Sequence, residues 1–145
     1  MSLRSTRPAE REERRIDSDF RERYQLSDQG AAAEVEKLVL GTDFGVSGYT
    51  TLALADLLSQ ELDLSPNERV LDVGTGCGWP GLRAAIEKRC RVVGSDLPLE
   101  GLDRARRRAR LEHATDRFST VRSSARQLPF KRGSFDAILH TDVLC

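Results

Sequence analysis

Residues 69–81 read RVLDVGTGCGWPG, and the prediction of the fold starts from them. A short apolar run that ends at Val73 leads into three glycines at alternate positions, Gly74, Gly76 and Gly78. The apolar run suits a strand that is buried on both faces. Alternate glycines let the chain turn sharply and let a ligand lie directly against the backbone. The stretch therefore predicts a strand followed by a tight binding loop.

Strands and helices alternate beyond this point. The predicted strands are 68–74, 91–95, 118–122 and 135–140, and the predicted helices between the first three are 80–88 and 98–113. Strands separated by helices favour right-handed crossovers, so the predicted fold class is α/β with a doubly wound parallel sheet. Ligands of such sheets bind at the carboxyl ends of the strands, which places the site at the glycine loop.

Two helices are predicted ahead of the sheet. One covers 31–40, and the other begins at Thr50 or Thr51, either of which can cap it. Leucines recur at helical spacing along the second helix and predict one buried face, formed by Leu54, Leu57, Leu58 and Leu62. The residues between the two helices form a glycine-containing loop.

The composition is that of one globular domain. The chain has 145 residues, of which 39% are hydrophobic and 32% charged, enough for a single core under a well-solvated surface. The 23 Lys and Arg residues balance 23 Asp and Glu residues, so no net field attracts nucleic acid or an anionic membrane. Residues 1–25 are rich in charge and predict a disordered arm or a marginal surface helix, whereas residues 26–145 form the domain.

Cysteine usage favours a cytoplasmic protein. Cys77, Cys90 and Cys145 are odd in number and widely spaced, with no CxxC pair for zinc or thiol exchange, so no metal site is expected. Residues 1–19 lack the apolar stretch of a secretory signal, and no segment is long enough to span a bilayer. The five arginines within 104–110 are expected on the solvated outer face of their helix.

Three kinds of nucleotide ligand compete for the glycine loop. A phosphate-binding P-loop needs Lys and then Ser or Thr after its last glycine, where Trp79 and Pro80 stand instead. Residues 76–81, GCGWPG, spell GxGxxG, a weak sign of a dinucleotide site, so NAD is one candidate ligand. Asp72 favours a third class, because a carboxylate at the mouth of the strand suits a ligand with an ammonium and a sulfonium and repels a pyrophosphate. S-adenosylmethionine is such a ligand.

The segment 70–78, VLDVGTGCG, resembles motif I of the class I S-adenosylmethionine-dependent methyltransferases. In that family an acid-x-Gly-x-Gly-x-Gly loop wraps the methionine part of the cofactor. The resemblance implies a Rossmann-like sheet of seven strands in the order 3-2-1-4-5-7-6, of which residues 1–145 supply the part 3-2-1-4. It also implies cofactor contacts along the loop, at Asp72, Gly74, Thr75, Gly76, Cys77 and Gly78.

Asp96 follows the second predicted strand, about twenty residues beyond the glycine loop. An acid at this place can accept hydrogen bonds from both ribose hydroxyls, and Asp96 matches the acidic residue that the family has there. Leu97 falls where the family packs an apolar side chain on the adenine. Asp96 could instead belong to the N-cap region of the helix that Pro98 opens, and the two roles can coexist.

A second block, 122–130, reads RSSARQLPF and is followed by Phe135 and Asp136. It resembles the D-A-x-x-L-P-F passage of small-molecule methyltransferases related to the ubiquinone and menaquinone C-methylating enzymes. Ser124 stands where the family has an Asp that accepts a hydrogen bond from the adenine amino group, and Ala125 follows it as a further expected contact. A hydroxyl accepts more weakly than a carboxylate, so this departure weakens the implied selectivity for adenine.

Residues outside these two blocks are weaker candidates. Tyr49 and Thr50 lie ahead of the sheet, where many family members close over the cofactor, or else they cap and pack the next helix. His140 and Asp142 follow the fourth strand, where the family lines the space near the transferred methyl. Both are candidate catalytic residues, with a general base as the role, and His140 is also a candidate cofactor contact. A lone His at a strand end is more often structural.

The resemblance implies transfer of a methyl group from S-adenosylmethionine to a small-molecule acceptor. Residues 1–145 lack the fifth to seventh strands, so the alternative is a truncated cofactor-binding module or partner subunit without catalysis of its own. In the order 3-2-1-4 the fourth strand is an outer strand, yet Ala137, Ile138 and Leu139 have the continuous apolar character of a strand buried on both faces. Such an edge predicts pairing with a second copy or with a separate chain.

Overall fold

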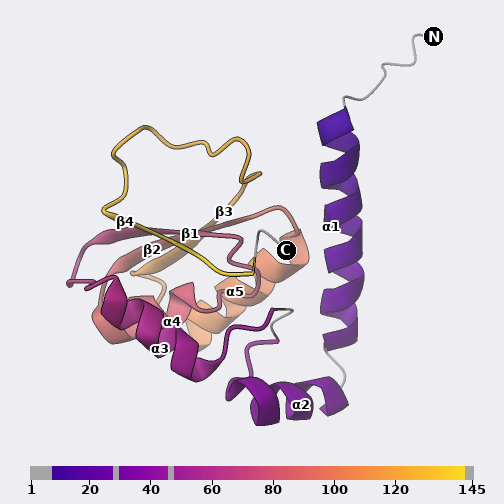
Figure 1. Cartoon of the computed structure of the whole chain (residues 1–145), viewed down its shortest axis with the longest axis horizontal. Coiled ribbons are helices and arrows are strands. Elements are labelled where there is room, and N and C mark those ends of the chain that lie inside the picture. The colour runs from indigo at the N-terminus through magenta and orange to yellow at the C-terminus, as the bar shows by residue number, and fades with distance from the viewer. Residues whose placement is uncertain (1–7, 28–29, 46–47, 143–145) are drawn as a thin grey trace.

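Four parallel strands form one sheet in the described residues, in the predicted order β3-β2-β1-β4 (Figure 1). The computed structural model describes residues 8–27, 30–45 and 48–142. The strands are β1 (Arg69–Val73), β2 (Arg91–Asp96), β3 (Phe118–Arg122) and β4 (Ala137–His140). Cys145 lies outside the described residues, whereas Cys77 and Cys90 are free, buried thiols.

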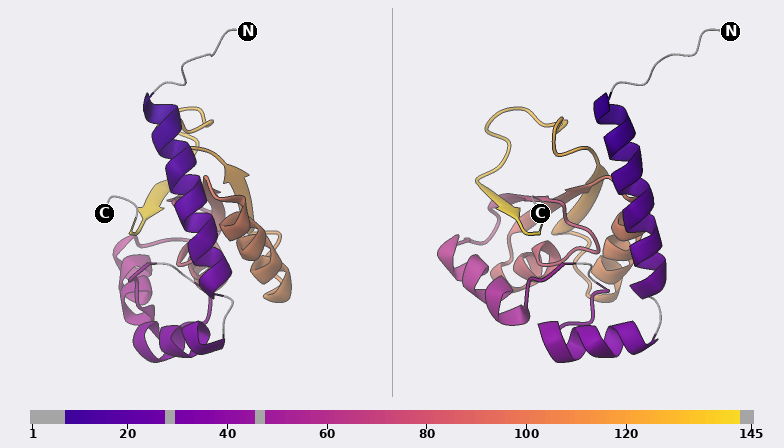
Figure 2. Two further views of the ribbon diagram at one scale, coloured as in Figure 1. Left: turned by 90° about the vertical axis from the view of Figure 1, so that its right-hand side faces the viewer. Right: turned by 45° about the vertical axis from the view of Figure 1, so that its right-hand side comes forward.

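The described part of the chain forms five helices. They are α1 (Pro8–Ser27), α2 (Gly30–Leu40), α3 (Leu52–Glu61), α4 (Gly81–Lys88) and α5 (Leu99–Leu111). α4 and α5 connect the first three strands and pack on β2 and β3, and α3 packs on α4. The segment 123–136 arches on the other side of the sheet and contains no helix (Figure 1). The carboxyl ends of the strands are left accessible beside α1 (Figure 2).

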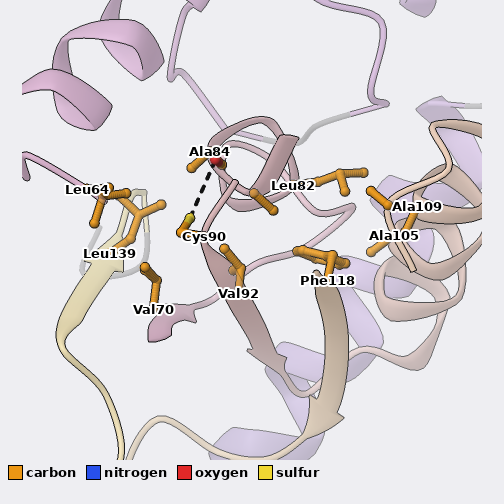
Figure 3. Close-up of a cluster of buried hydrophobic side chains, with 12 residues drawn as sticks. Leu64, Val70, Leu82, Ala84, Cys90, Val92, Ala105, Ala109, Phe118 and Leu139 are labelled. Carbon is orange, nitrogen blue, oxygen red and sulfur yellow. Dashed lines mark hydrogen bonds between the residues drawn. The ribbon is translucent and has the colours of Figure 1, made fainter. Parts of the chain in front are cut away.

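The core lies between the sheet and the helices α4 and α5. Val70, Val92 and Phe118 project from three strands toward Leu82 and Ala105 of the helices (Figure 3). These five side chains are at most 4% exposed. Successive residues of a strand point to opposite faces, so the buried valines fix which face of β1 and β2 meets the helices. The core thereby holds the two strand ends from which the glycine loop and Asp96 follow.

α3 begins as predicted but buries less of its leucine face. Thr51 is the N-cap residue, and its hydroxyl accepts a hydrogen bond from Leu54 N at 3.2 Å. Leu54 and Leu57 are 42% and 49% exposed, so the predicted burial is wrong at these two positions. Leu58 and Leu62 pack against the core as predicted. The reason is that α4 is the main neighbour of α3 among the helices and strands, and one main neighbour buries only a narrow stripe of a helix.

β4 is shorter and less buried than predicted. It begins at Ala137, because the preceding Asp136 accepts from Arg69 N with its carboxylate at 2.8 Å and donates its own N–H to Arg69 O at 2.7 Å. Leu139 is buried, but Ile138 is 59% exposed. Ile138 points to the face opposite Leu139, away from α4 and α5, and most of its side chain is left exposed there. Burial on both faces is therefore wrong for β4 in this structure.

The segment predicted as a disordered arm or a marginal helix forms α1, an α-helix of 20 residues. Arg21 of α1 pairs with Glu100 of α5 at 2.9 Å, and Tyr24 is only 2% exposed. α1 therefore packs onto the sheet-bearing part of the chain, and the division of the chain at residue 25 stays a prediction. Within the described ranges, no helix is long and apolar enough to cross a membrane.

Three of the arginines of α5 have partners in other parts of the fold, so the prediction of a wholly solvated face is only partly correct. Arg106 donates to Thr120 Oγ1 of β3 at 2.9 Å. Arg104 donates to Tyr24 O, and its guanidinium lies 5.6 Å from the centroid of the Tyr24 ring. Arg108 pairs with Asp43 at 2.9 Å and lies 4.5 Å from the centroid of the Phe44 ring. The contacts of Arg104 and Arg108 hold the segments that precede the sheet against α5.

Candidate functional site

A cavity of about 610 Å³ opens at the carboxyl ends of β1 and β2, where ligands of open parallel sheets bind. Most of the residues predicted to contact a cofactor line it: Tyr49, Gly74, Thr75, Gly76, Cys77, Asp96, Leu97, Ser124 and Ala125. Three predicted residues, Asp72, Gly78 and His140, do not. The structure thus brings together predicted residues that lie up to 76 positions apart in the sequence, from Tyr49 to Ala125.

The glycine loop folds back onto the end of β2. Gly74 N and Thr75 N both donate to Ser95 O, at 2.8 and 3.1 Å. Gly76 has a φ of +51°, and a β-carbon on it would lie 2.8 Å from Tyr24 Oη. Glycine is required there both by the backbone conformation and by the close approach of α1. The loop therefore presents bare backbone to the cavity.

Asp96 joins the loop to the end of β2. Its Oδ2 accepts from Gly76 N and its Oδ1 from Leu97 N, both at 2.7 Å. Burial raises the pKa of Asp96, although these two backbone donors act in the opposite direction. Pro98, and not Asp96, is the N-cap residue of α5. Each carboxylate oxygen keeps a further lone pair, so Asp96 can accept hydrogen bonds from a ligand in the cavity.

Asp72 lies behind the glycine loop and is 1% exposed. Its Oδ2 accepts from the Thr75 hydroxyl at 2.7 Å, and a β-carbon on Gly81 would overlap the same oxygen. Desolvation by burial raises the pKa of Asp72 to about 7, against the hydrogen bonds from Thr75 and Gly81, which lower it. Asp72 therefore shapes the loop from the side of α4, and its contact with a cofactor ammonium stays a prediction.

Cys77 and Trp79 connect the glycine loop to the segment ahead of α3. The Cys77 thiol donates to Gly45 O at 3.1 Å, and burial raises its pKa to about 12, so it stays protonated and is no nucleophile. Trp79 Nε1 donates to Thr50 O at 2.8 Å, and its ring packs 5.0 Å from that of Phe44. These contacts fix one wall of the cavity.

Asp142 secures the same wall from the end of β4. Its Oδ2 accepts from Tyr49 N at 2.9 Å, from Thr50 N at 3.2 Å and from Thr50 Oγ1 at 2.9 Å. An oxygen that accepts from three donors is well suited to hold the chain in position and poorly suited to remove a proton. Thr50 is buried by these bonds and does not line the cavity. His140 is exposed at the end of β4.

α1 forms a wall of the cavity that sequence reasoning missed, since no chemistry was expected from this helix. The residues that it contributes are Glu13, Ile16, Phe20, Arg23 and Tyr24. Ile16, Phe20 and Tyr24 recur every four residues, which is the spacing of one helical face and the signal that could have located this wall.

Ser124 is held by this helix. Its hydroxyl donates to Glu13 Oε1 at 2.6 Å and accepts from Arg126 N at 3.2 Å. The family has a carboxylate at the position of Ser124. In this chain a carboxylate lies beside that position, and Glu13 of α1 supplies it.

The strand order, the glycine loop and the acid after β2 define a class I, Rossmann-like methyltransferase fold. Residues 70–145 match the family model described as "Methyltransferase domain", and the chain belongs to this family.

Known relatives match only part of their own length. A sterol 24-C-methyltransferase from Candida albicans is 33% identical over 81 residues, which are 56% of this chain and 22% of the relative. A 27-O-demethylrifamycin SV methyltransferase from Amycolatopsis mediterranei is 33% identical over 88 residues, or 61% of this chain and 32% of the relative. The solved structure of an S-adenosylmethionine-dependent methyltransferase from Geobacter sulfurreducens, in complex with S-adenosyl-L-homocysteine, has a TM-score of 0.52 at 26% identity, over 55% of this chain and 32% of that one. The chain spans no more than about a third of these proteins.

Proposed function

We propose that the cavity binds S-adenosylmethionine and that the chain is the cofactor-binding part of a small-molecule methyltransferase. The observation that carries this proposal is Asp96, which lines the cavity beside the bare backbone of the glycine loop and accepts from Gly76 N at 2.7 Å. Membership of the methyltransferase family and a structural neighbour that binds S-adenosyl-L-homocysteine support it.

The residues present fit such a cofactor. A volume of about 610 Å³ falls within the range of small-ligand pockets, about 300 to 1,000 Å³. Asp96 can accept hydrogen bonds from the ribose hydroxyls, and the glycine loop leaves room for the methionine part. Leu97, Ile16 and Phe20 offer an apolar slot for the adenine ring. The ribose, methionine and adenine parts of the cofactor thus each have a counterpart in the cavity.

The proposed reaction is methyl transfer by in-line attack. When bound, S-adenosylmethionine supplies an electrophilic methyl on its sulfonium, which an oxygen, nitrogen or carbon of the acceptor attacks, leaving S-adenosyl-L-homocysteine. The chain's own residues hold the cofactor and exclude water from one side of it, so their contribution is positioning. Asp142 acts as a positioning residue for Tyr49 and Thr50, and His140 stays a candidate general base.

One relative's name specifies a carbon acceptor and the other an oxygen acceptor, so the family serves both atoms. The alternative proposal is a truncated cofactor-binding module or partner subunit without catalysis of its own. Ile138 on β4 is 59% exposed, and an outer strand presents unpaired backbone groups. We propose that β4 pairs with a second copy or with a separate chain.

Light scattering after size-exclusion chromatography, beside a methyl-transfer assay, distinguishes these two versions. A monomer that turns over supports the complete enzyme, whereas a dimer or an inactive monomer that binds the cofactor supports the module. A cytoplasmic location is proposed as well, supported by the free thiols of Cys77 and Cys90.

Calorimetric titration with S-adenosylmethionine, S-adenosyl-L-homocysteine and NAD in parallel tests the proposed ligand. Binding of the first two without NAD is expected, because the chain belongs to the methyltransferase family and resembles a structure in complex with S-adenosyl-L-homocysteine. Binding of NAD with no response to either methionine compound contradicts the proposal.

A further inference from the structure

We infer that Glu13 of α1, held in place by Ser124, accepts a hydrogen bond from the exocyclic amino group of the cofactor's base and thereby sets the selectivity for adenine. This inference rests on the proposed function, since it names a residue that determines the specificity of the same cavity.

The first step is the orientation of the two side chains. Ser124 Oγ donates to Glu13 Oε1 at 2.6 Å and accepts from Arg126 N at 3.2 Å. The single hydroxyl proton of Ser124 is thus committed to Glu13, and one of its two lone pairs is engaged by Arg126. The carboxylate of Glu13 has about four acceptor sites and uses one for Ser124, so most of the acceptor capacity at this end of the cavity belongs to Glu13.

The second step is the position of Glu13 in the cavity. Glu13 is half-buried and lines the cavity together with Ile16, one turn along α1, and with Leu97, which follows β2. Two apolar side chains, which suit a flat ring, and a carboxylate therefore line the same cavity. An ionised carboxylate only accepts, so it stabilises a ring edge that carries an N–H donor and repels one that carries a carbonyl oxygen.

The third step is the anchoring of α1, without which Glu13 has no fixed place. Glu12, next to Glu13, pairs with Arg126 at 2.8 Å. Asp17, one turn on, lies 3.5 Å from Arg122 at the end of β3. Exposed ion pairs of this kind are individually weak, but they flank Glu13 on both sides along the helix. The carboxylate is therefore presented from a helix that is attached before and after it.

The competing account is that Glu13 serves only to dock α1. Loss of docking weakens every ligand of the cavity alike, whereas loss of a base-reading contact changes the preference between two bases. The decisive quantity is therefore the ratio of two dissociation constants and not either value alone.

The experiment compares S-adenosyl-L-homocysteine with S-inosyl-L-homocysteine, in which a carbonyl replaces the exocyclic amine, by calorimetry on the full chain. We expect the unmodified chain to prefer the adenosyl compound by about tenfold or more, the usual effect of one charge-assisted hydrogen bond. Glu13→Gln is expected to bring the ratio close to one or to invert it, because the Gln amide can donate to the inosine carbonyl.

Glu10→Gln is the matched control, since Glu10 is an exposed acid on the same helix and does not line the cavity. It is expected to keep the adenosyl preference of the unmodified chain. If circular dichroism shows that Glu13→Gln does not fold, Ser124→Ala, which releases the carboxylate, is expected to reduce the same ratio.

An equal loss of affinity for both compounds in Glu13→Gln, with the ratio unchanged, overturns the inference and leaves the proposed function standing. Binding of neither compound to the unmodified chain contradicts the proposed function and the inference together.

Discussion

Replacement of Asp72 by Asn is predicted to remove a pH dependence from the stability of the protein. Burial raises the pKa of Asp72 from 3.8 to about 7. The folded chain therefore keeps a proton that the unfolded chain releases between about pH 4 and pH 7. Because the folded state binds more protons in this window, the free energy of unfolding falls as the pH rises through it. A rise of the pKa from 3.8 to about 7 corresponds to about 4 kcal/mol.

Asn cannot release a proton, and its Oδ1 can still accept from the Thr75 hydroxyl that bonds Asp72 at 2.7 Å. The Asp72→Asn variant is therefore expected to match the unmodified chain near pH 4 and to exceed its free energy of unfolding by about 4 kcal/mol above pH 7. A smaller slope of the same sign should remain, since burial raises the pKa of Asp96 as well.

Urea unfolding, followed by circular dichroism at half-unit intervals between pH 4 and pH 8, measures this slope. Asp116→Asn is the control, because the side chain of Asp116 is 63% exposed and its loss should leave the slope unchanged. The reasoning is refuted if Asp72→Asn shows the same fall in stability as the unmodified chain, since another group would then be the one that titrates.

Three further substitutions test separate parts of the site. Asp96→Ala should weaken binding of S-adenosyl-L-homocysteine by about 1 to 3 kcal/mol in a calorimetric titration, the cost of losing a charged hydrogen-bond partner, and an unchanged dissociation constant would remove Asp96 from the site. Gly81→Ala should lower the free energy of unfolding by about 1 to 3 kcal/mol, because the added methyl overlaps Asp72 Oδ2; unaltered chemical unfolding would show that the contact relaxes freely. Trp79→Phe leaves the buried Thr50 carbonyl without its 2.8 Å donor and should cost about 1 to 3 kcal/mol, so a melting temperature equal to that of the unmodified chain argues against this bond.

The strands and the glycine loop could be predicted from sequence because their signals are local. The β3 bounds, Phe118–Arg122, agree with the prediction at both ends, and β2 extends it by one residue, to Asp96. An apolar run that ends in alternate glycines is compatible with few structures other than a strand and a tight loop, because side chains at the glycine positions would block the turn. The position of the cavity followed from the parallel topology alone.

The direction in which the Asp72 side chain points could be predicted from the sequence, although the resemblance to motif I directed attention to the cofactor. Asp72 stands two residues after Val70, so both point to the same face of β1, which is the face that the helices cover. Alternation therefore places the carboxylate toward α4, whereas the resemblance associates the motif with the cofactor. The alternation of side chains along a strand predicts which face a residue points to, whereas a motif predicts only the kind of ligand that binds nearby.

The wall formed by α1 could not be predicted from the sequence, because it depends on tertiary contacts with residues far along the chain. Ile16, Phe20 and Tyr24 are the few apolar residues in a strongly charged helix, and a stripe so narrow is marginal until a partner covers it. Its partner, the glycine loop, lies more than 50 positions further along the chain. The pairing of Glu13 with Ser124 across 111 positions has no local signal at all.

The amide resonances of the ¹⁵N-labelled chain, recorded during titration with S-adenosyl-L-homocysteine, test the central claim most directly. Gly76 and Leu97 both donate their N–H to Asp96, at 2.7 Å, so a ligand that binds the Asp96 carboxylate must move these two resonances. The account predicts saturable shifts at both, with Val93 and Ser119 at the far end of the sheet unaffected and with no response to NAD. Shifts confined to Val93 and Ser119, or a response of Gly76 and Leu97 to NAD and not to S-adenosyl-L-homocysteine, would contradict it.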